Sequence, residues 1–366
     1  MSERTLRRGW TTGACATAAA AAAYQALLTG AFPDPVPVEL AAGRRVEFAL
    51  AVKRFDGEQA TAGVVKDAGD DPDVTHGALV LATVKEGAEG SGVLFRAGAG
   101  VGTITLPGLP LPVGEPAINP APRRMIRSAL ARVATEHGGA GEAIVEIGVA
   151  DGEAVARRTW NPRLGIRGGL SILGTTGIVV PYSCSAWIAS IRQGIDVAHA
   201  TGHEHVIAAT GDTSERAAQA RYGLAESALL DMGDFAGAVL KHLGRRPIAR
   251  LTLAGGFAKL SKLAGGHLDL HSGRSQVDLE RLAGASRDLG GDESLARAIR
   301  GANTGLEALE LCQAADVPLA ERVAADARGV ALGVLDGAPV QAEVLVFDRT
   351  GRLVGAADHR RDRVGE

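Results

Sequence analysis

The sequence predicts two domains, an α+β domain at the N-terminal end and an α/β domain with a mainly parallel sheet behind it. Up to about residue 160, alternating apolar and polar runs outnumber helical patterns. From Gly169 onward, short β-type runs are each followed by a glycine turn and a helical pattern, which is typical of βαβ units. We therefore expect domains at residues 1–163 and 164–345, with residues 346–366 forming a terminal hairpin strand and a charged tail.

The first domain opens with an alanine-rich helix. Thr11 or Thr12 can cap its N-terminus and Gly30 can end it. Its small side chains favour close approach by a neighbouring element. After Pro37 several runs alternate as strands do, and Pro120 is placed to start a second long helix. The clearest strand patterns among these runs are ALVLATVKEG, GSGVLFRAGAGVGTITL and AIVEIGVADG.

The second domain repeats the order of strand, glycine turn and helix, as in HVIAATGDTSERAAQARYG and IARLTLAGGFAKLSKLAGG. This pattern predicts a Rossmann-like fold, whose ligands bind beyond the carboxyl ends of the strands. A strict G-x-G-x-x-G is absent from the sequence, so a dinucleotide cofactor lacks its usual signature. The run AEVLVFDRTGRLVG predicts a closing hairpin, and the sequence does not say which domain receives it.

Composition excludes several classes of protein. Of 366 residues, 46% are hydrophobic and only 4% aromatic, which suits two cores of small aliphatic side chains. A net charge of −3 with mixed signs gives neither a basic stripe for nucleic acid nor a polybasic membrane anchor. Three distant cysteines argue against a disulfide framework and a metal clip. The polar start and the short alanine run resemble neither a signal peptide nor a membrane span, so we expect a cytoplasmic protein.

The segment from Gly100 to Arg127 has the composition of a ligand-holding loop. Six prolines make it stiff and extended, and three arginines follow in the first turns of the expected helix, Arg123, Arg124 and Arg127. Each guanidinium can bind a carboxylate through two hydrogen bonds, so the cluster suits a ligand with several carboxylates. The alternative is a proline-rich surface connector whose arginines lie in solvent.

A run of acids follows an apolar strand pattern, with Asp67, Asp70, Asp71 and Asp73 within seven positions. Carboxylates this close repel each other unless a cation, backbone amides or a proton separates them. The run could orient a substrate, act in acid/base chemistry or bind a cation, although the spacing lacks the EF-hand pattern. The alternative is an Asx-rich turn whose acids cap the next helix.

Three glycine turns are candidates for a cofactor site in the second domain. The loop Gly174-Thr175-Thr176-Gly177 offers two hydroxyls and backbone amides, which suit a sulfonium cofactor because that group needs no phosphate cradle. Asp212, after Gly211, could bind a ribose, or Asp212 and Glu215 could form a capping box. Gly255-Gly256 could let a ligand approach the backbone or could form a tight turn.

The histidines give weaker signals. His199, His203 and His205 are expected on one loop without a fourth ligand nearby, so a metal site there is not favoured. His267 and His271 could face one cleft and contact a ligand or a metal, or could be ordinary loop residues.

Five long motifs together carry a family resemblance. The motifs are GWTTGACATAAAAAA, KDAGDDPDVTHGA, GVGTITLPGLPLPVGEPAINPAPRRMI, GIRGGLSILGTTGIVVP and GGFAKLSKLAGGHLDLHS. With these motifs in this order, the sequence resembles the CbiD family of cobalt-precorrin-5B C1-methyltransferases from residue 7 to about residue 305. It departs from the family at Asp269, where many members have a second histidine, and at residues 211–215, where many have a G-N-x-G-E motif.

The resemblance implies methyl transfer from S-adenosylmethionine to C1 of a ring-contracted corrin macrocycle, giving cobalt-precorrin-6A in cobalamin biosynthesis. It implies cobalt within the substrate and no metal held by the protein. A precorrin carries many carboxylate arms, so arginines become its expected clamps. Methyl transfer needs in-line placement and exclusion of water more than a strong base. Three rivals remain: methylation of a metal-free precorrin, a pyridine-nucleotide oxidoreductase and a non-catalytic tetrapyrrole carrier. Homo-oligomerisation and handover to neighbouring pathway enzymes are left open.

Site residues are expected as follows. The acids expected to act on the macrocycle are Asp67, Asp70 and Asp71. The cofactor is expected at Gly174, Thr175, Thr176, Gly177, Gly211, Asp212, Gly255 and Gly256. The substrate is expected at Arg8, Thr11, Thr12, Glu115, Asn119, Arg123, Arg124 and His271, with Arg7, Arg163 and Arg167 as further clamps.

Overall fold

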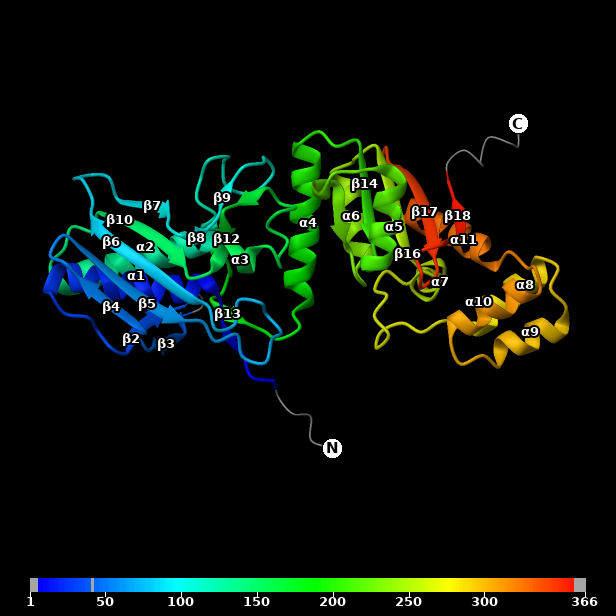
Figure 1. Ribbon diagram of the computed structural model, residues 1–366, viewed down its shortest axis with the longest axis horizontal. Helices are drawn as coiled ribbons and strands as arrows, with labels where there is room; N and C mark the ends of the chain where they lie inside the picture. Colours follow the sequence, from blue (N-terminus) through cyan, green and yellow to red (C-terminus); the bar gives the residue numbers. More distant parts are fainter. Residues whose placement is uncertain (1–5, 41–42, 359–366) are drawn as a thin grey trace. The chain divides into compact units, whose positions relative to one another are not determined.

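The computed structural model describes residues 6–40 and 43–358 (Figure 1). The chain divides into two compact units between Ser185 and Ala186. This division lies later than the expected boundary after Arg163, because residues beyond that point pair with strands of the first unit. The pairs are β11 (Ile166–Arg167) with β9 (Thr103–Ile104), β12 (Gly169–Leu170) with β8 (Gly100–Val101), and β13 (Ile178–Val179) with β1 (Gly9–Trp10).

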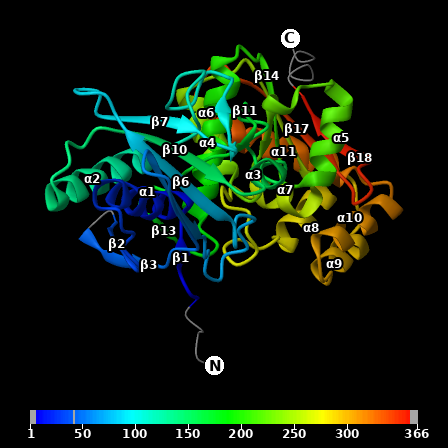
Figure 2. The same cartoon turned by 60° about the vertical axis from the view of Figure 1, so that its left-hand side comes forward.

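The first unit contains a five-stranded mixed sheet in the order β4-β5-β6-β10-β7. Neighbouring strands within this sheet run antiparallel, except that β10 and β7 are parallel to each other. Helices α1 and α2 pack against each other, and α1 also packs on β5 and β6 (Figures 1 and 2). The strands are β4 (Val52–Phe55), β5 (Gln59–Val65), β6 (Leu79–Glu86), β7 (Val93–Ala97) and β10 (Ala143–Val149).

Helix α1 (Thr12–Thr29) fills the core of this unit. The Thr11 hydroxyl accepts a hydrogen bond from the backbone N–H of Ala14 (3.2 Å), and Gly30 ends the helix at a φ of 74°. Both predicted ends are confirmed. The alanines from Ala18 to Ala23 are all buried, so the helix presents small side chains to neighbours on every side, which permits close packing. The remaining elements are β2 (Val36–Glu39), β3 (Arg45–Phe48), α2 (Pro120–His137) and α3 (Gly152–Ala156).

The second unit contains a sheet in the order β15-β14-β16-β17-β18. The first four strands are parallel, and β18 is antiparallel to β17. Every residue of β14 is buried, as expected for a parallel strand covered on both faces. The predicted closing hairpin is confirmed as β17 and β18, and it belongs to this sheet. The strands are β14 (His205–Ala209), β15 (Leu229–Asp231), β16 (Arg250–Gly256), β17 (Gln341–Phe347) and β18 (Leu353–Ala357).

Helices follow the strands of this unit as the repeated pattern predicted. Each parallel strand from β14 to β16 is followed by a helix, so the alternation of strand and helix is confirmed. The final residues of the predicted charged tail, 359–366, lie outside the described residues. The helices are α4 (Cys184–Ala200), α5 (Asp212–Tyr222), α6 (Ala236–Arg245), α7 (Phe257–Ala264), α8 (Leu279–Asp288), α9 (Glu293–Arg300), α10 (Gly305–Ala314) and α11 (Leu319–Leu335).

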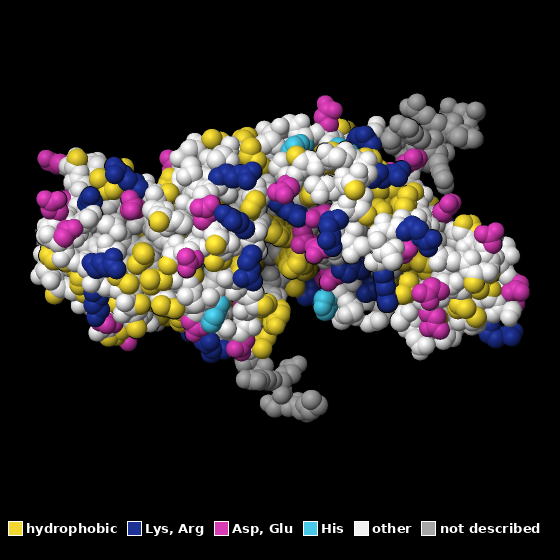
Figure 3. All heavy atoms as spheres, in the orientation of Figure 1, with side chains coloured by type: hydrophobic (Ala, Val, Ile, Leu, Met, Phe, Trp, Pro, Cys, Tyr) yellow, Lys and Arg dark blue, Asp and Glu magenta, His cyan; other side chains and the backbone are white. Residues whose placement is uncertain are grey.

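Charged side chains of both signs are interspersed over the face of the molecule shown in Figure 3, as the mixed charges of the sequence suggested. Over residues 6–40 and 43–358, no helix has both the length and the apolar character needed to cross a membrane.

Candidate functional site

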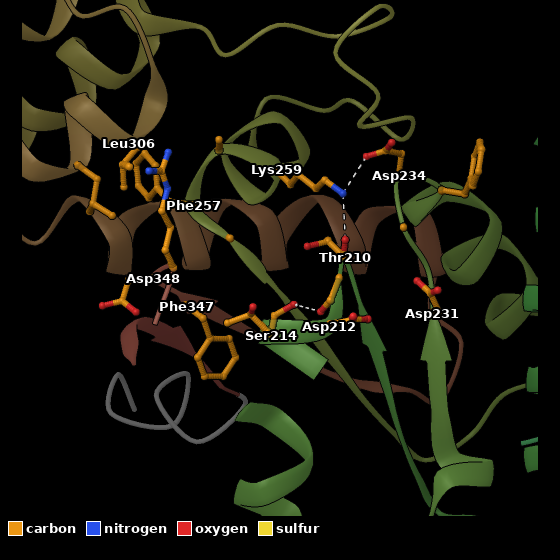
Figure 4. A pocket seen from close by; sticks show the side chains of 18 of the residues that line it. Thr210, Asp212, Ser214, Asp231, Asp234, Phe257, Lys259, Leu306, Phe347 and Asp348 are labelled. Atoms are coloured by element: carbon orange, nitrogen blue, oxygen red, sulfur yellow. Dashed lines mark hydrogen bonds and ion pairs between the residues drawn. The ribbon is translucent and has the colours of Figure 1, made fainter. Parts of the chain in front are cut away.

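A cavity of about 680 Å³ opens at the carboxyl ends of β14, β15, β16 and β17, within the second unit (Figure 4). In α/β sheets, ligands bind in this position because the loops after the strands surround it. Four loops supply most of the lining, at Thr210–Ser214, Asp231–Phe235, Gly256–Lys259 and Phe347–Arg349. Trp187, Leu306 and Leu309 complete it.

Carboxylates dominate the charge of this pocket. Lys259 is engaged within the protein, since its Nζ donates to the carbonyl of Thr210 (2.9 Å) and lies 3.1 Å from Oδ1 of Asp234 (Figure 4). The lining therefore favours a ligand with positive charge over one with phosphates. The ionisable groups are Asp212, Asp231, Asp234, Asp348, Lys259 and Arg349.

Asp348, one of the four pocket carboxylates, holds a turn of the backbone. The hydroxyl of Thr350 (2.7 Å) and the backbone N–H groups of Thr350 and Arg352 donate to its carboxylate, which fixes the turn between β17 and β18. These bonds, led by the Thr350 hydroxyl, lower the pKa of Asp348 to about 2. Asp348 therefore contributes a fixed negative charge to the pocket.

Three predicted cofactor residues line this cavity, namely Gly211, Asp212 and Gly256. Gly255 lies inside β16 instead, where a Cβ would lie 2.9 Å from the side chain of Thr210. The alternative of a capping box at Asp212 is wrong, because Gly211 occupies the cap position and Asp212 is the first residue of α5. The N-terminal turn of α5 thus faces the pocket with its positive dipole end.

Asp231 is a pocket residue that the sequence analysis missed. It ends β15 and follows Gly211 by twenty residues, the spacing at which an acid binds the ribose in nucleotide-binding βαβ units. The preceding turn lacks the strict glycine fingerprint that would make this spacing a recognisable signal in the sequence. The second missed residue, Trp187, comes from α4, and the sequence pattern of that helix gives no signal of its position.

The placement of the loop Gly174–Gly177 at a strand of the parallel sheet is wrong. The loop lies in the first unit, between β12 and β13, and packs on the start of α1. Gly177 accepts from the backbone N–H of Thr11 (3.0 Å), and a Cβ at Gly174 would lie 2.4 Å from the Thr11 side chain. The loop is shaped by this close approach. Cofactor binding by Thr175 and Thr176 stays a prediction.

Thr11 and Thr12 are buried where the start of α1 meets the segment from Leu173 to Gly177. The Thr12 hydroxyl accepts from the backbone N–H of Leu173 (2.9 Å), while Thr11 caps α1. A Cβ at Gly13 would lie 2.8 Å from Cγ of Pro122, so the starts of α1 and α2 also meet closely. The hydroxyls predicted to contact substrate therefore join α1 to its neighbouring loop.

The acidic run anchors the N-terminal segment. Two guanidinium nitrogens of Arg7 donate to the carboxylate of Asp67, one at 2.9 Å, and its backbone N–H donates to Asp70 (2.7 Å). The Arg7 guanidinium and the N–H of Gly69 lower the pKa of Asp67 to about 2. Asp67 is thus ionised at neutral pH and is unsuited to hold a proton there.

The rest of the run has partners in this unit as well. Asp71 accepts from the backbone N–H of Tyr182 (2.8 Å), and Asp73 pairs with the buried Lys66 (2.7 Å). Tyr182 has a φ of 56°, a left-handed conformation that the Asp71 contact helps to hold. The alternative that these acids cap a following helix is wrong, because the next element is the strand β6.

Arg123 is bound within the proline-rich loop. It donates to Glu115 (2.8 Å) and to the carbonyls of Ile118 (2.8 Å) and Pro116 (3.1 Å), and it lies 5.2 Å from the ring centroid of Phe95. Its side chain is only 13% exposed. Arg123 therefore holds the proline-rich loop in its observed conformation through contacts within the protein.

The neighbouring predicted residues differ from Arg123 in exposure. Arg124, one position along α2, is exposed, and so is Arg8 near the N-terminus. Asn119 is the N-cap residue of α2, and its backbone N–H donates to Ile172 (2.9 Å). The predicted helix start at Pro120 is confirmed. Arg167, another predicted clamp, is exposed as well, so Arg8, Arg124 and Arg167 are predicted clamps that remain accessible to a ligand.

The histidines hold local contacts. His271 accepts from the backbone N–H of Gly273 (3.1 Å) in the loop after α7. His203 bonds to Ser227 (2.8 Å) and His205 to Thr252 (2.8 Å). The expectation that His199, His203 and His205 share one loop is wrong, because His199 lies in α4 and His205 in β14. Among the described residues, no group of three or more His, Cys, Asp or Glu side chains is arranged to hold a metal ion.

Comparison with known proteins identifies the family. Residues 1–181 match the CbiD family model, and residues 269–358 match the model of the CbiD C-terminal domain. The chain is 58% identical, over 97% of its length and 99% of the relative, to a cobalt-precorrin-5B C(1)-methyltransferase of Paramagnetospirillum magneticum. It is 60% identical to the protein of that name in Rhodospirillum rubrum, over 96% of this chain and 97% of the relative.

Among solved structures, the crystal structure of cobalamin biosynthesis protein (cbiD) from Archaeoglobus fulgidus matches with 28% identity and a TM-score of 0.39, covering 69% of this chain and 77% of that one. The relatives from Paramagnetospirillum magneticum and Rhodospirillum rubrum match over nearly their whole length, which confirms the family resemblance of the motifs. This chain belongs to the CbiD family.

Proposed function

We propose that this protein methylates C1 of cobalt-precorrin-5B, with S-adenosylmethionine as methyl donor, in cobalamin biosynthesis. Identity of 58% and 60% to enzymes of that name, over nearly the full length of both partners, supports this activity. The product of the reaction is then cobalt-precorrin-6A.

We place the methyl donor in the acidic pocket of the second unit. The observation that carries this placement is a cavity at the carboxyl ends of four parallel strands in which carboxylates outnumber cations. The strand order and the helices between the strands support a Rossmann-like description of this unit. A sulfonium ion is a cation, so negative lining stabilises it, whereas the pyrophosphate of a dinucleotide would be repelled.

Within the pocket, each end of the donor has a matching group. The carboxylate of its methionine end suits the N-terminal turn of α5, where backbone N–H groups and the helix dipole favour an anion. Its ribose hydroxyls suit the Asp231 carboxylate at the end of β15. Gly211 and Gly256 let the ligand approach the backbone, since a Cβ built at either residue would have no described atom within 4 Å beyond the adjacent residues of the chain.

The macrocycle is assigned to the first unit. Its carboxylate arms suit the exposed guanidiniums of Arg124 and Arg8, while Arg123 holds the proline-rich loop beside Arg124. The sulfonium supplies an electrophilic methyl group, and C1 of the conjugated macrocycle supplies the electron pair of the new bond. The protein's residues orient the two reactants and exclude water, which accounts for much of the rate in such a displacement.

The test is incubation of the purified protein with S-adenosylmethionine and either cobalt-precorrin-5B or its metal-free form, followed by mass spectrometry. We expect the cobalt form to gain one methyl group and S-adenosylhomocysteine to appear in equal amount. Methylation of the metal-free form alone would change the assigned substrate. Tight macrocycle binding without methylation would indicate a carrier, and tight binding of NAD(P)H without binding of S-adenosylhomocysteine would indicate an oxidoreductase.

A further inference from the structure

We infer that Trp187 is the stacking surface for the adenine base of the methyl donor. This inference rests on the proposed function, because it adds a contact within the same pocket. Trp187 lines the cavity from α4, and 43% of its surface remains exposed in the described structure. An indole of this exposure in the acidic pocket offers an apolar surface that a planar ligand can cover.

The position of the indole is fixed from the sheet side. Its Nε1–H donates to the backbone carbonyl of Asp231 (3.1 Å), the residue whose carboxylate we assign to the ribose. The base of a nucleoside is joined directly to its ribose, so a ribose held at the end of β15 brings the base close to the same strand end. Trp187 is attached to that end by a hydrogen bond and therefore lies within reach of the base.

Two further residues set the orientation of the ring. A Cβ at Gly233 would lie only 3.2 Å from Cζ2 of Trp187, so glycine at this position lets the indole pack directly on the backbone. The ring centroid of Phe235 lies 6.4 Å from that of Trp187, with an angle of 54° between the rings. The indole is thus held in place before a ligand binds, which reduces the entropy lost on binding.

In single-stranded nucleic acids, any base can stack on an aromatic side chain. Removing the aromatic side chain there weakens binding about tenfold to a hundredfold, and we expect an effect of this size for the adenine base in this pocket. A phenylalanine would retain part of the stacking surface and lose the bond to Asp231. We therefore expect a graded series, in which Trp187→Phe weakens binding less than Trp187→Ala does.

The experiment is titration calorimetry of S-adenosylhomocysteine and of adenosine into the parent protein, Trp187→Phe, Trp187→Ala and Asp231→Asn, with thermal melting to confirm folding. We expect Trp187→Ala to weaken both ligands about tenfold to a hundredfold and Trp187→Phe to lie between it and the parent. Folded Trp187→Ala with parental affinity, alongside weakened Asp231→Asn, would overturn the stacking inference and leave the proposed site intact. Parental affinity in both folded variants would overturn the site itself.

A fluorescence measurement gives an independent readout. The sequence has three tryptophans, so the matched control is Trp160→Phe, which lies in the first unit. Quenching of intrinsic fluorescence by S-adenosylhomocysteine should persist in Trp160→Phe and disappear in Trp187→Phe at saturating ligand. Quenching that survives in Trp187→Phe would overturn the inference.

Discussion

The two units use the polar residues of their loops differently. In the first unit, the predicted site residues are largely bonded to one another, as in the pairs Arg7–Asp67 and Arg123–Glu115. In the second unit, Asp212 and Asp231 face a cavity of about 680 Å³. The comparison teaches that an acid or arginine in a glycine-rich loop is as readily an anchor as a ligand. What distinguishes Asp212 and Asp231 from the anchors of the first unit is that they line a cavity at the strand ends.

The largest expected effect tests the anchoring role of the N-terminal segment. A Cβ at Gly9 would lie 2.0 Å from the carbonyl carbon of Ala68, beside Asp67. Gly9→Ala must therefore move backbone, and we expect it to lower the free energy of unfolding by about 3 kcal/mol or more. Denaturant titration measures this.

The matched control is Gly284→Ala in α8. Apart from the adjacent residues and the backbone of α8 itself, no described atom lies within 4 Å of a Cβ built there. Since alanine favours helix over glycine, we expect no loss and a gain of up to about 1 kcal/mol. If Gly9→Ala were as stable as this control, the acidic run would not be holding the segment in the way we describe.

The next effect separates two adjacent arginines. Arg123→Ala removes an ion pair, two backbone contacts and the contact with Phe95, so we expect it to cost about 1–3 kcal/mol of stability. Arg124→Ala should change stability by less than about 0.5 kcal/mol, because the side chain is exposed.

Macrocycle binding should show a different order for the same two variants. Arg124→Ala should weaken binding by about 1.5–3 kcal/mol if its guanidinium clamps a carboxylate arm, with S-adenosylhomocysteine binding unchanged. Thermal melting and macrocycle titration of both variants together distinguish an arginine that stabilises the loop from one that binds the macrocycle. A stable Arg124→Ala with parental macrocycle affinity would remove Arg124 from the proposed site.

The smallest effect concerns pH. The pKa of Asp67 falls from its ordinary 3.8 to about 2 on folding, because Arg7 donates to the carboxylate. The unfolded state therefore binds more protons over this range, and the stability that Asp67 contributes is full above about pH 4 and lost as the pH falls through 2. Its side chain is 42% exposed, so solvent screening keeps the contribution small.

Asp67→Asn should accordingly flatten the acid limb of a plot of melting temperature against pH. The same variant tests the predicted catalytic role: a large loss of single-turnover methylation with little change in melting at neutral pH would favour a part in the reaction. Parental turnover would assign Asp67 to anchoring alone. An acid limb identical to that of the parent would contradict the Arg7–Asp67 pair as drawn.

Local signals predicted much of the fold. Thr11 and Gly30 mark the ends of α1, and Pro120 starts α2, because caps and prolines act on the backbone beside them. The strand–turn–helix repeats likewise gave the parallel strands of the second unit. The loop Gly174–Gly177 was misplaced because the apolar run before it looks like a short parallel strand, and only pairing with distant residues shows otherwise.

The candidate site was harder to predict for the same reason. Gly211, Asp212 and Gly256 follow strands and were found from that position. Arg123 looked like a ligand clamp because its partner, Glu115, is recognisable only once the loop is folded. Trp187 comes from a helix whose sequence does not show that it reaches the end of β15. Such contacts are set by tertiary packing and not by residue type or spacing.

The most direct test of where the methyl donor binds compares one variant from each unit. Titration calorimetry of S-adenosylhomocysteine would use the parent protein, Asp231→Asn in the second unit and Thr176→Val in the predicted loop of the first. We expect Asp231→Asn to weaken binding by about 1.5–3 kcal/mol, because it removes a charged hydrogen-bond acceptor, and Thr176→Val to leave it unchanged. Parental affinity in Asp231→Asn together with weakened binding in Thr176→Val would contradict the account and return the cofactor to the first unit.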